Sequence, residues 1–284
     1  MRNIGRAQAK RSSAWHLVQS VDRALSLLDL LGNGNASLGI SEFSRATGLS
    51  KAVVFRLVRT LERHGYVMQS EDRRYALGTK PLELASVVLH RFDVRQVARA
   101  TMLDLAERTG ESAVLTAPSR DGVICLDTVD SPQQIRVSFR LGRITPWHAG
   151  AAGKLHLAFQ PEPLIQQVIA RGLPRHTART VTSKSRLLRD LARIRHDGYA
   201  FTVGEFDDGV AAISAPIVDS RKEVVAAVSI GGPAQRFSDE RLQDLVNEVR
   251  QAAGRISLLL LGSPPPGGPP MSEARALQTQ REAR

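Results

Sequence analysis

The order of short helices and strands predicted for residues 20–80 constrains the fold more than any other feature of this sequence. Apolar residues at helical spacing, turn residues and two short β-rich runs define these elements. Ser41 and Ser50 are predicted N-caps of the second and third helices. The predicted elements are helices over about 21–31, 41–47 and 51–64, and strands over 66–68 and 74–77. Helix, turn, helix and hairpin in this order predict a winged helix-turn-helix.

The third predicted helix has one apolar face and one basic face. An apolar stripe at positions 54, 57, 58 and 61 would pack in a core, and the opposite face could enter a DNA major groove. The alternative is a charged face that is simply solvated. The candidate DNA contacts are Ser41, Ser50, Lys51, Ala52, Phe55, Arg56 and Arg59, with Arg73, Arg74 and Tyr75 from the hairpin as a wing.

The charge distribution favours the same interpretation. The chain has a formal net charge of +11, and its first 80 residues hold 13 Lys and Arg against 6 Asp and Glu. The remaining residues hold 26 against 22, so the excess is concentrated in the first quarter of the chain, which includes the predicted basic tail and winged domain. A local basic excess suits a polyanion, since binding releases condensed counterions. A soluble basic protein without such a partner is the alternative.

Beyond the hairpin the pattern changes. Residues 81–108 read as a helical connector, and strands and helices alternate from residue 109 to 262. We expect strands over about 113–116, 123–129, 135–139, 199–205, 211–218 and 224–230, and helices ending near 159 and over about 163–171, 185–196 and 239–261. Residues 1–19 are expected to be a flexible basic tail and residues 263–284 a disordered one. The fold class is therefore predicted to be α+β, in two domains of different kind.

Catalytic and metal-binding patterns are missing from the sequence. Cys125, the one cysteine, lies in an apolar strand pattern and is expected in a core rather than as a nucleophile. His148 and His156 have no obvious third ligand and are expected to be structural. We therefore expect no metal, no cofactor and no enzyme activity. Without a secretory signal or a membrane-spanning stretch, we expect a cytoplasmic protein that does not bind membranes.

Small residues are clustered between His148 and the helix that follows. Positions 149–153 are Ala, Gly, Ala, Ala and Gly, so a ligand could approach the backbone closely there. The N–H groups at the start of this helix would favour an anion such as a carboxylate. Tight packing of the helix on a sheet explains the same residues equally well.

Several motifs, taken together and in this order, resemble the IclR-type bacterial transcriptional regulators. The resemblance covers about residues 20–260. It rests on Ser20–Leu25, Ile40–Phe43, Thr47–Lys51, Arg56-Leu57, Thr60-Leu61, Gly65–Val67, Tyr75–Gly78, His148–Lys154, Gly198–Ala200, Gly209, Ala215–Ile217 and Gly231–Pro233. It departs from the family at Ala52 and Val53, where hydroxyl residues are usual, and at Phe55, where His or Tyr is common. The resemblance therefore predicts DNA binding but does not predict the operator sequence.

This resemblance implies a GAF-like effector domain, an antiparallel sheet flanked by helices that binds small organic acids or aromatic compounds. Aligned motif by motif, the effector-binding residues would be Ala151, Ala152, Gly153, Thr202, Val210, Ala212, Ser229 and Gly231. Relatives that bind small keto acids carry an acid, a cysteine and two serines where this chain has Thr202, Ala212, Ser229 and Gly231. A less polar pocket is expected, for a larger or more apolar carboxylate such as an aromatic acid.

The resulting hypothesis is a transcriptional regulator controlled by a small molecule. A homodimer or dimer of dimers would bind double-stranded DNA at an inverted repeat, and the effector would act through the connector. An enzyme with an accessory nucleic-acid-binding domain is the alternative from another class, and an architectural DNA binder without ligand response is a third.

Overall fold

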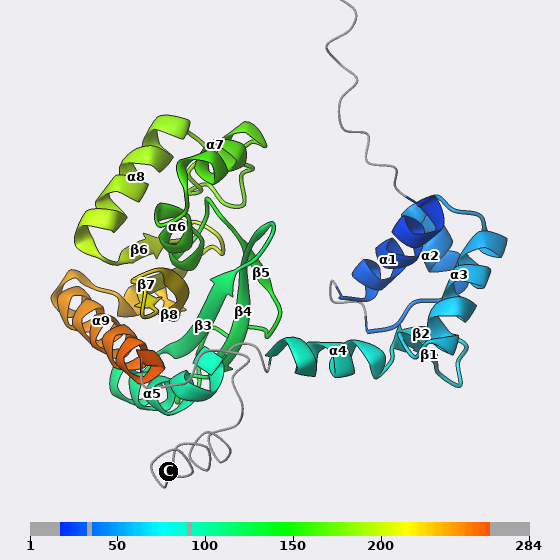
Figure 1. Ribbon diagram of the computed structural model, residues 1–284, viewed down its shortest axis with the longest axis horizontal. Coiled ribbons are helices and arrows are strands. Elements are labelled where there is room, and N and C mark those ends of the chain that lie inside the picture. Colours follow the sequence, from blue (N-terminus) through cyan, green and yellow to red (C-terminus); the bar gives the residue numbers. More distant parts are fainter. Residues whose placement is uncertain (1–17, 33–35, 90–92, 262–284) are drawn as a thin grey trace, which may run out of the picture. The chain divides into compact units, whose positions relative to one another are not determined.

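The computed structural model describes residues 18–32, 36–89 and 93–261, so the predicted tails lie almost wholly outside the described residues. The chain divides into two compact units, Met1–Val88 and Leu89–Arg284. Each unit has a hydrophobic core of its own. Figure 1 shows the helices and strands of both units.

The first unit is a winged helix-turn-helix. Its elements are α1 (Gln19–Gly32), α2 (Ile40–Thr47), α3 (Lys51–Arg63), β1 (Val67–Gln69) and β2 (Tyr75–Leu77), the two strands pairing antiparallel. Gly48 ends α2 with a φ of 71°, a left-handed conformation that glycine adopts without a Cβ clash. This sharp turn leads directly into α3, whose N-cap is Ser50 as predicted.

Two local predictions for this unit are wrong. The N-cap of α2 is Gly39 rather than Ser41, and the Glu42 side chain accepts a hydrogen bond of 2.7 Å from the Gly39 N–H. Ser41 lies in the first turn of the helix instead. Tyr75, expected at an exposed wing, is only 2% exposed and packs in the core with Phe43 and Val58. Backbone hydrogen bonds of 2.9 Å in both directions between Tyr75 and Leu38 hold it there.

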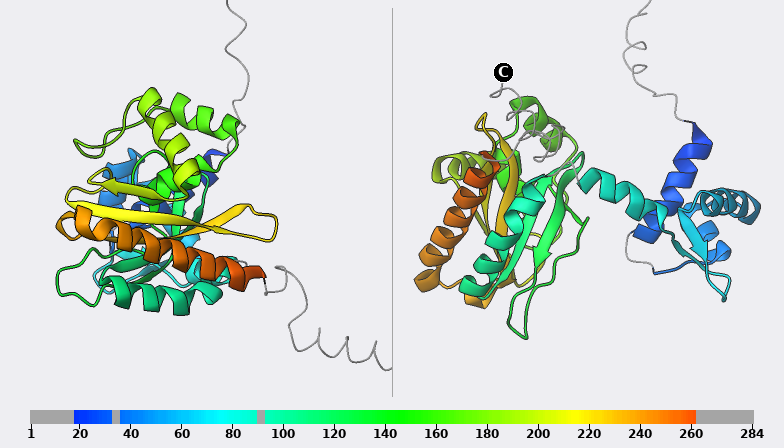
Figure 2. Two further views of the ribbon diagram at one scale, coloured as in Figure 1. Left: turned by 90° about the vertical axis from the view of Figure 1, so that its left-hand side faces the viewer. Right: turned by 60° about the horizontal axis from the view of Figure 1, so that its bottom comes forward.

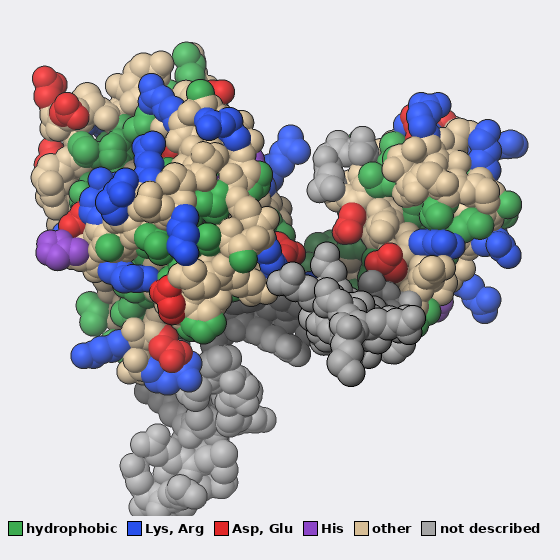
Figure 3. All heavy atoms as spheres, turned by 90° about the horizontal axis from the view of Figure 1, so that it is seen from above, with side chains coloured by type: hydrophobic (Ala, Val, Ile, Leu, Met, Phe, Trp, Pro, Cys, Tyr) green, Lys and Arg blue, Asp and Glu red, His purple; other side chains and the backbone are tan. Residues whose placement is uncertain are grey.

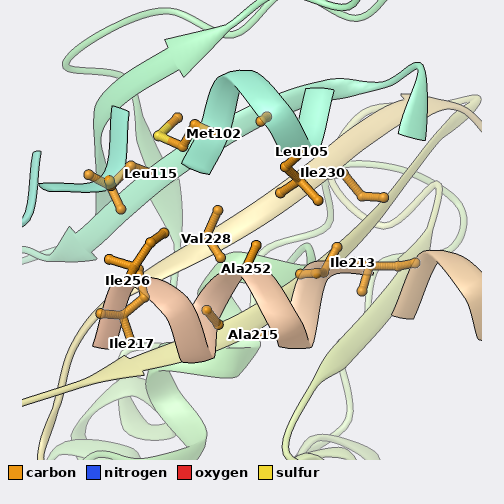
Figure 4. Close-up of a cluster of buried hydrophobic side chains, with 14 of the residues drawn as sticks. Met102, Leu105, Leu115, Ile213, Ala215, Ile217, Val228, Ile230, Ala252 and Ile256 are labelled. Atoms are coloured by element: carbon orange, nitrogen blue, oxygen red, sulfur yellow. The ribbon is translucent and has the colours of Figure 1, made fainter. Parts of the chain in front are cut away.

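Within the described residues, the region predicted as a connector contains two helices, α4 (Lys80–Leu89) and α5 (Asp93–Thr109). Buried side chains of α5, including Ala98, Met102 and Leu105, belong to the core of the second unit. Figure 4 shows Met102 and Leu105 opposite Ala252 and Ile256. Because one side of α5 is buried, this helix is part of the core of the second unit.

The second unit is built on a curled six-stranded antiparallel sheet in the order β5-β4-β3-β8-β7-β6. Its strands are β3 (Ser112–Pro118), β4 (Gly122–Val129), β5 (Ile144–Pro146), β6 (Ala200–Val203), β7 (Val210–Val218) and β8 (Val224–Pro233). Residues 135–139, predicted as a strand, have no regular structure, and the edge strand β5 follows them instead. The predicted α+β class, with an antiparallel sheet flanked by helices, is confirmed.

Helices cover both faces of this sheet. α5 and α9 (Asp239–Leu261) pack on one face, and α6 (Ala151–Ala158), α7 (Glu162–Ala170) and α8 (Lys184–Asp197) lie on the other (Figure 2). Side chains alternate between faces along a strand. In β7, Ile213 and Ala215 therefore join the core under α9, whereas Ala212 faces α6. The α6 face is where the predicted effector residues come together.

Candidate DNA-contact surface and effector pocket

The exposed face of α3 carries the residues predicted to contact DNA. Lys51, Ala52, Arg56 and Arg59 are exposed, and the Phe55 side chain is 50% exposed. Val54 and Val58 on the opposite face are fully buried. The predicted division into an apolar and a basic face is therefore correct. Figure 3 shows Lys and Arg side chains on the part of this unit that includes α3.

The basic residues of α3 differ in how freely they could meet a phosphate or a base. Arg59 Nη1 lies 2.7 Å from Glu62 Oε2 one turn later. Lys51 and Arg56 have no ion-pair partner within the described parts of the chain. A cation without an intramolecular partner has no ion pair to break when it binds an anion, so these two side chains are the better placed.

The two hairpin arginines have different environments. Arg73 is exposed at the turn, with a φ of 59°. Arg74 lies 2.9 Å from Glu42 of α2 and donates hydrogen bonds to the Ser37 carbonyl and hydroxyl at 2.9 and 3.0 Å. The pKa of the Glu42 carboxyl is lowered, first by the Gly39 N–H and then by Arg74. Arg74 therefore fastens the hairpin to α2, whereas Arg73 is free to reach outward.

A pocket of about 700 Å³, including its mouth, lies between the sheet and the start of α6. Most of the lining is apolar, and the polar groups are few. Its walls are Val114, Thr116, Cys125, Phe139, Arg140, Arg143, Thr145, Gly150, Ala151, Ala152, Thr202, Glu205, Phe206, Asp207, Val210, Ala212, Ser229 and Ile230.

Six of the eight predicted effector residues line this pocket, namely Ala151, Ala152, Thr202, Val210, Ala212 and Ser229. The other two do not. A Cβ on Gly153 would collide with the Pro146 carbonyl, so Gly153 lets α6 pack closely on β5. Gly231 is covered by the ring of Phe139. At these two glycines, close packing rather than ligand contact explains the small residue.

Loop residues that the sequence did not indicate also line the pocket. Arg143 precedes β5 and Asp207 follows β6, yet Arg143 Nη2 lies 3.1 Å from Asp207 Oδ1. The Arg143 guanidinium also lies 4.8 Å from the centre of the Phe206 ring, a cation–π contact. Because β5 and β6 are opposite edges of the sheet, this pair joins its two edges across the pocket.

A buried cluster of charges lies beside the pocket. Lys154 is 1% exposed, and its Nζ lies 2.9 Å from Asp190 Oδ2 and 2.7 Å from Glu205 Oε1. The second oxygen of Glu205, Oε2, is buried and has no hydrogen-bond partner. Arg193 Nη2 lies 4.0 Å from the other oxygen of Asp190, so two cations balance the two carboxylates. The group left over on this side of the pocket is the unpartnered Glu205 oxygen, a hydrogen-bond acceptor.

Cys125, His148 and His156 contact different groups. Burial raises the pKa of the Cys125 thiol to about 11, which keeps it protonated and unreactive. His156 Nε2 pairs with Thr116 Oγ1 at 3.1 Å, and burial lowers the pKa of His156 to about 4. His148 Nε2 faces the Pro174 carbonyl at 2.9 Å instead. No group of three metal-ligating side chains occurs in residues 18–32, 36–89 and 93–261.

Family models match both units of the chain. The model described as "Bacterial transcriptional regulator IclR C-terminal" matches residues 86–258, and the "IclR helix-turn-helix domain" matches residues 20–71. The chain belongs to the IclR family of bacterial transcriptional regulators. The resemblance noted from the sequence is therefore confirmed, and the chain is a DNA-binding regulator of transcription.

The chain matches most of the length of curated regulators of this family. The regulator KdgR of Escherichia coli K12 is 34% identical over 243 residues, which are 84% of this chain and 92% of that protein. The transcriptional repressor IclR of the same organism is 32% identical over 246 residues, covering 85% and 89%. Both units of this chain therefore have counterparts in characterised regulators.

Solved IclR structures share the fold. A regulator from Alicyclobacillus acidocaldarius matches with a TM-score of 0.75 at 27% identity, over 86% of this chain and all of that one. An IclR homologue from Microbacterium hydrocarbonoxydans matches with a TM-score of 0.76 at 25% identity, over the same shares, and was solved in complex with 4-hydroxybenzoate. One IclR homologue of this architecture thus binds an aromatic acid.

No helix in the described ranges has both the length and the apolar character needed to cross a bilayer.

Proposed function

We propose that this regulator binds an inverted-repeat operator as a homodimer or dimer of dimers, and that a small organic acid in the pocket of its second unit controls it. The observation that carries the proposal is a basic, exposed α3 in one unit together with an enclosed, mainly apolar pocket in the other. Two-fold symmetry of a dimer would match a palindromic DNA site.

The DNA contacts of the proposal come from α3 and the hairpin. Lys51, Arg56 and Arg59 are the cations that would meet phosphates or base edges, and Arg73 would reach the backbone as part of the wing. Ala52 and Phe55 are exposed apolar residues on the same helix, which suits contact with thymine methyl groups. Ser41 and Ser50, at the starts of α2 and α3, would contact the phosphate backbone.

The effector of the proposal is a carboxylate, in particular an aromatic acid. Apolar lining by Val114, Ala212 and Ile230 suits a ring, and the Phe139 and Phe206 side chains add aromatic walls. Exposed Arg140 at the rim and the backbone N–H groups at the start of α6 favour an anion. The complex of the Microbacterium homologue with 4-hydroxybenzoate supports the same class of ligand.

Control of DNA binding would follow from unequal affinity of the effector for two states of the protein. α5 packs on the sheet beside the pocket-lining strand β3, and α4 precedes it in the chain. A ligand that changes the sheet would therefore act on the segment that joins the two units. In this proposal the protein is cytoplasmic and has no enzyme activity, cofactor or metal.

Selection of random duplex DNA by the purified full-length chain, at stated salt, tests the proposal. We expect enrichment of one inverted repeat, and release or tightening of the selected probe by an aromatic acid. Recovery of no preferred sequence would contradict the proposal. Such a result would leave a non-specific DNA binder or an enzyme, which turnover of candidate acids would then distinguish.

A further inference from the structure

The pocket beside α6 has a hydrogen-bond acceptor that no group of the protein satisfies. Glu205 lines the pocket and is 9% exposed, and its Oε2 atom is buried without a hydrogen-bond partner. An acceptor that is buried without a partner costs free energy, so such groups are rarely left unmatched without a reason. A ligand group that donates a hydrogen bond would remove this cost.

The other oxygen of the same carboxylate limits what that donor can be. Glu205 Oε1 lies 2.7 Å from the Lys154 ammonium, which also binds Asp190. A second cation on Oε2 would therefore lie close to an existing positive charge in a poorly solvated place. A neutral donor such as an O–H group makes the hydrogen bond to Oε2 without this repulsion.

A positively charged side chain lies at the rim of the pocket. Arg140 is exposed, lines the pocket and has no ion-pair partner among the residues the structure describes. Its neighbour Arg143 is already paired with Asp207. Arg140 comes from the segment before edge strand β5, whereas Glu205 follows β6 at the other edge of the sheet. The pocket thus has a free cation on one side and a free acceptor on another.

We propose that Glu205 and Arg140 select a hydroxylated acid, with the ligand hydroxyl donating to Glu205 Oε2 and the ligand carboxylate pairing with Arg140. This inference rests on the proposed function, because it specifies the effector of the same pocket. The apolar part of the ligand would lie against Ala212 and Phe206, which line the same pocket.

Isothermal titration calorimetry of the full-length chain with matched pairs of acids tests the proposal. The probes are benzoate, phenylacetate and 3-phenylpropanoate, each with its para-hydroxy counterpart, so that the distance between the two groups varies. For the pair of fitting length, the hydroxylated acid is expected to bind about tenfold to a hundredfold more tightly, as for a hydrogen bond to a charged group. The para-methoxy analogue of that acid, which has no proton to donate, should lose this gain.

Three substitutions separate the two contacts. In Glu205→Gln the preference for the hydroxylated acid should fall to within about threefold, since the acceptor of the proposed bond is replaced. Asp190→Asn is the matched control, because Asp190 contacts the same Lys154 but does not line the pocket, and it should keep the preference. Arg140→Gln should weaken both members of a pair by about the same factor of ten.

The outcomes distinguish this inference from the proposed function. Equal binding of hydroxylated and plain acids by the unmodified chain overturns the role of Glu205 and leaves an acid-responsive regulator. Binding of no acid in the panel overturns both the carboxylate effector and the inference, whereas operator selection would stand independently. If Glu205→Gln does not fold, binding of the hydroxylated, methoxylated and plain acids to the unmodified chain still tests whether a ligand hydroxyl donates a hydrogen bond in the pocket.

Discussion

The ring of Phe139 packs directly on the backbone of Gly231, so closely that a Cβ at position 231 would lie 2.5 Å from Phe139 Cζ. Phe139 comes from the irregular segment before β5 and Gly231 from β8, at the centre of the sheet. The contact places an aromatic wall where the sequence alone indicated open pocket. It also makes the position of Phe139, and with it one boundary of the pocket, depend on a single glycine.

Gly231→Ala is expected to lower the free energy of unfolding by about 1–3 kcal/mol, because Phe139 must move to admit the methyl group. Gly254→Ala is the matched control, since Gly254 lies within α9 and nothing lies within 4 Å of a Cβ built there. In a helix interior this change should stabilise the protein by up to about 1 kcal/mol. Urea unfolding of both variants measures the difference, and equal stability of the two would contradict the packing described here.

Lys154→Met is expected to destabilise the second unit by about 3–5 kcal/mol. The substitution keeps most of the side-chain volume but leaves the carboxylates of Asp190 and Glu205 without their buried counter-charge. Arg171→Met is the control, because the Arg171–Asp121 pair is exposed on both sides. Exposed pairs contribute about 0–1 kcal/mol, so that variant should unfold almost as the parent does. A similar loss of unfolding free energy in both variants would show that the buried ion pairs of Lys154 contribute no more than the exposed pair.

The first unit was largely predictable from sequence because its signals are local. The apolar stripe of α3 and the Ser50 cap follow from spacing within a few residues, and both are present in the structure. Tyr75 was mistaken for a surface residue because its strand is too short for a burial pattern to be visible. Its pairing with Leu38, which buries it, connects residues that are far apart in the sequence.

Ala212 and Ser229, which the family resemblance assigned to effector binding, line the pocket, because side chains alternate between the two faces along each strand. Prediction from the sequence missed Arg143, Phe206 and Asp207 because these residues lie in loops after or before edge strands. Only the curl of the sheet brings the two edges together, and no local pattern encodes that contact. The burial of α5 could not be predicted either, since it depends on partners in α9 and the sheet.

Acid should weaken the second unit through His156. The folded-state pKa of this residue is lowered to about 4 by burial, whereas the imidazole of an unfolded chain titrates near 6.5. Between these values the unfolded chain binds more protons, so stability is full above about pH 6.5 and falls as the pH decreases toward 4. The loss attributable to this group is about 3 kcal/mol over that window.

Urea unfolding at pH 7.5 and pH 4.5 measures this effect, with Trp147 fluorescence in a Trp15→Phe background as the probe, because Trp147 is buried in the second unit. His156→Gln should reduce the pH dependence, and comparison with the parent cancels contributions from other groups. His196→Gln, whose side chain is 89% exposed in the parent, should leave it unchanged. An equally steep pH dependence in all three proteins would rule out His156 as the cause.

Arg56→Ala is expected to weaken binding to the selected operator by about 1–3 kcal/mol if this arginine contacts a base. In the described structure the Arg56 guanidinium has no intramolecular ion pair that DNA binding would have to break. Arg59→Ala should cost less if the Glu62 ion pair must be broken before Arg59 can bind DNA. Arg221→Ala in the second unit, where Arg221 pairs with Asp219 and Glu223, is the control for a change of net charge alone. Fluorescence anisotropy at fixed salt measures all three, and acid binding should be unaffected in each. Operator affinity unchanged by both α3 substitutions would mean that α3 does not read the DNA.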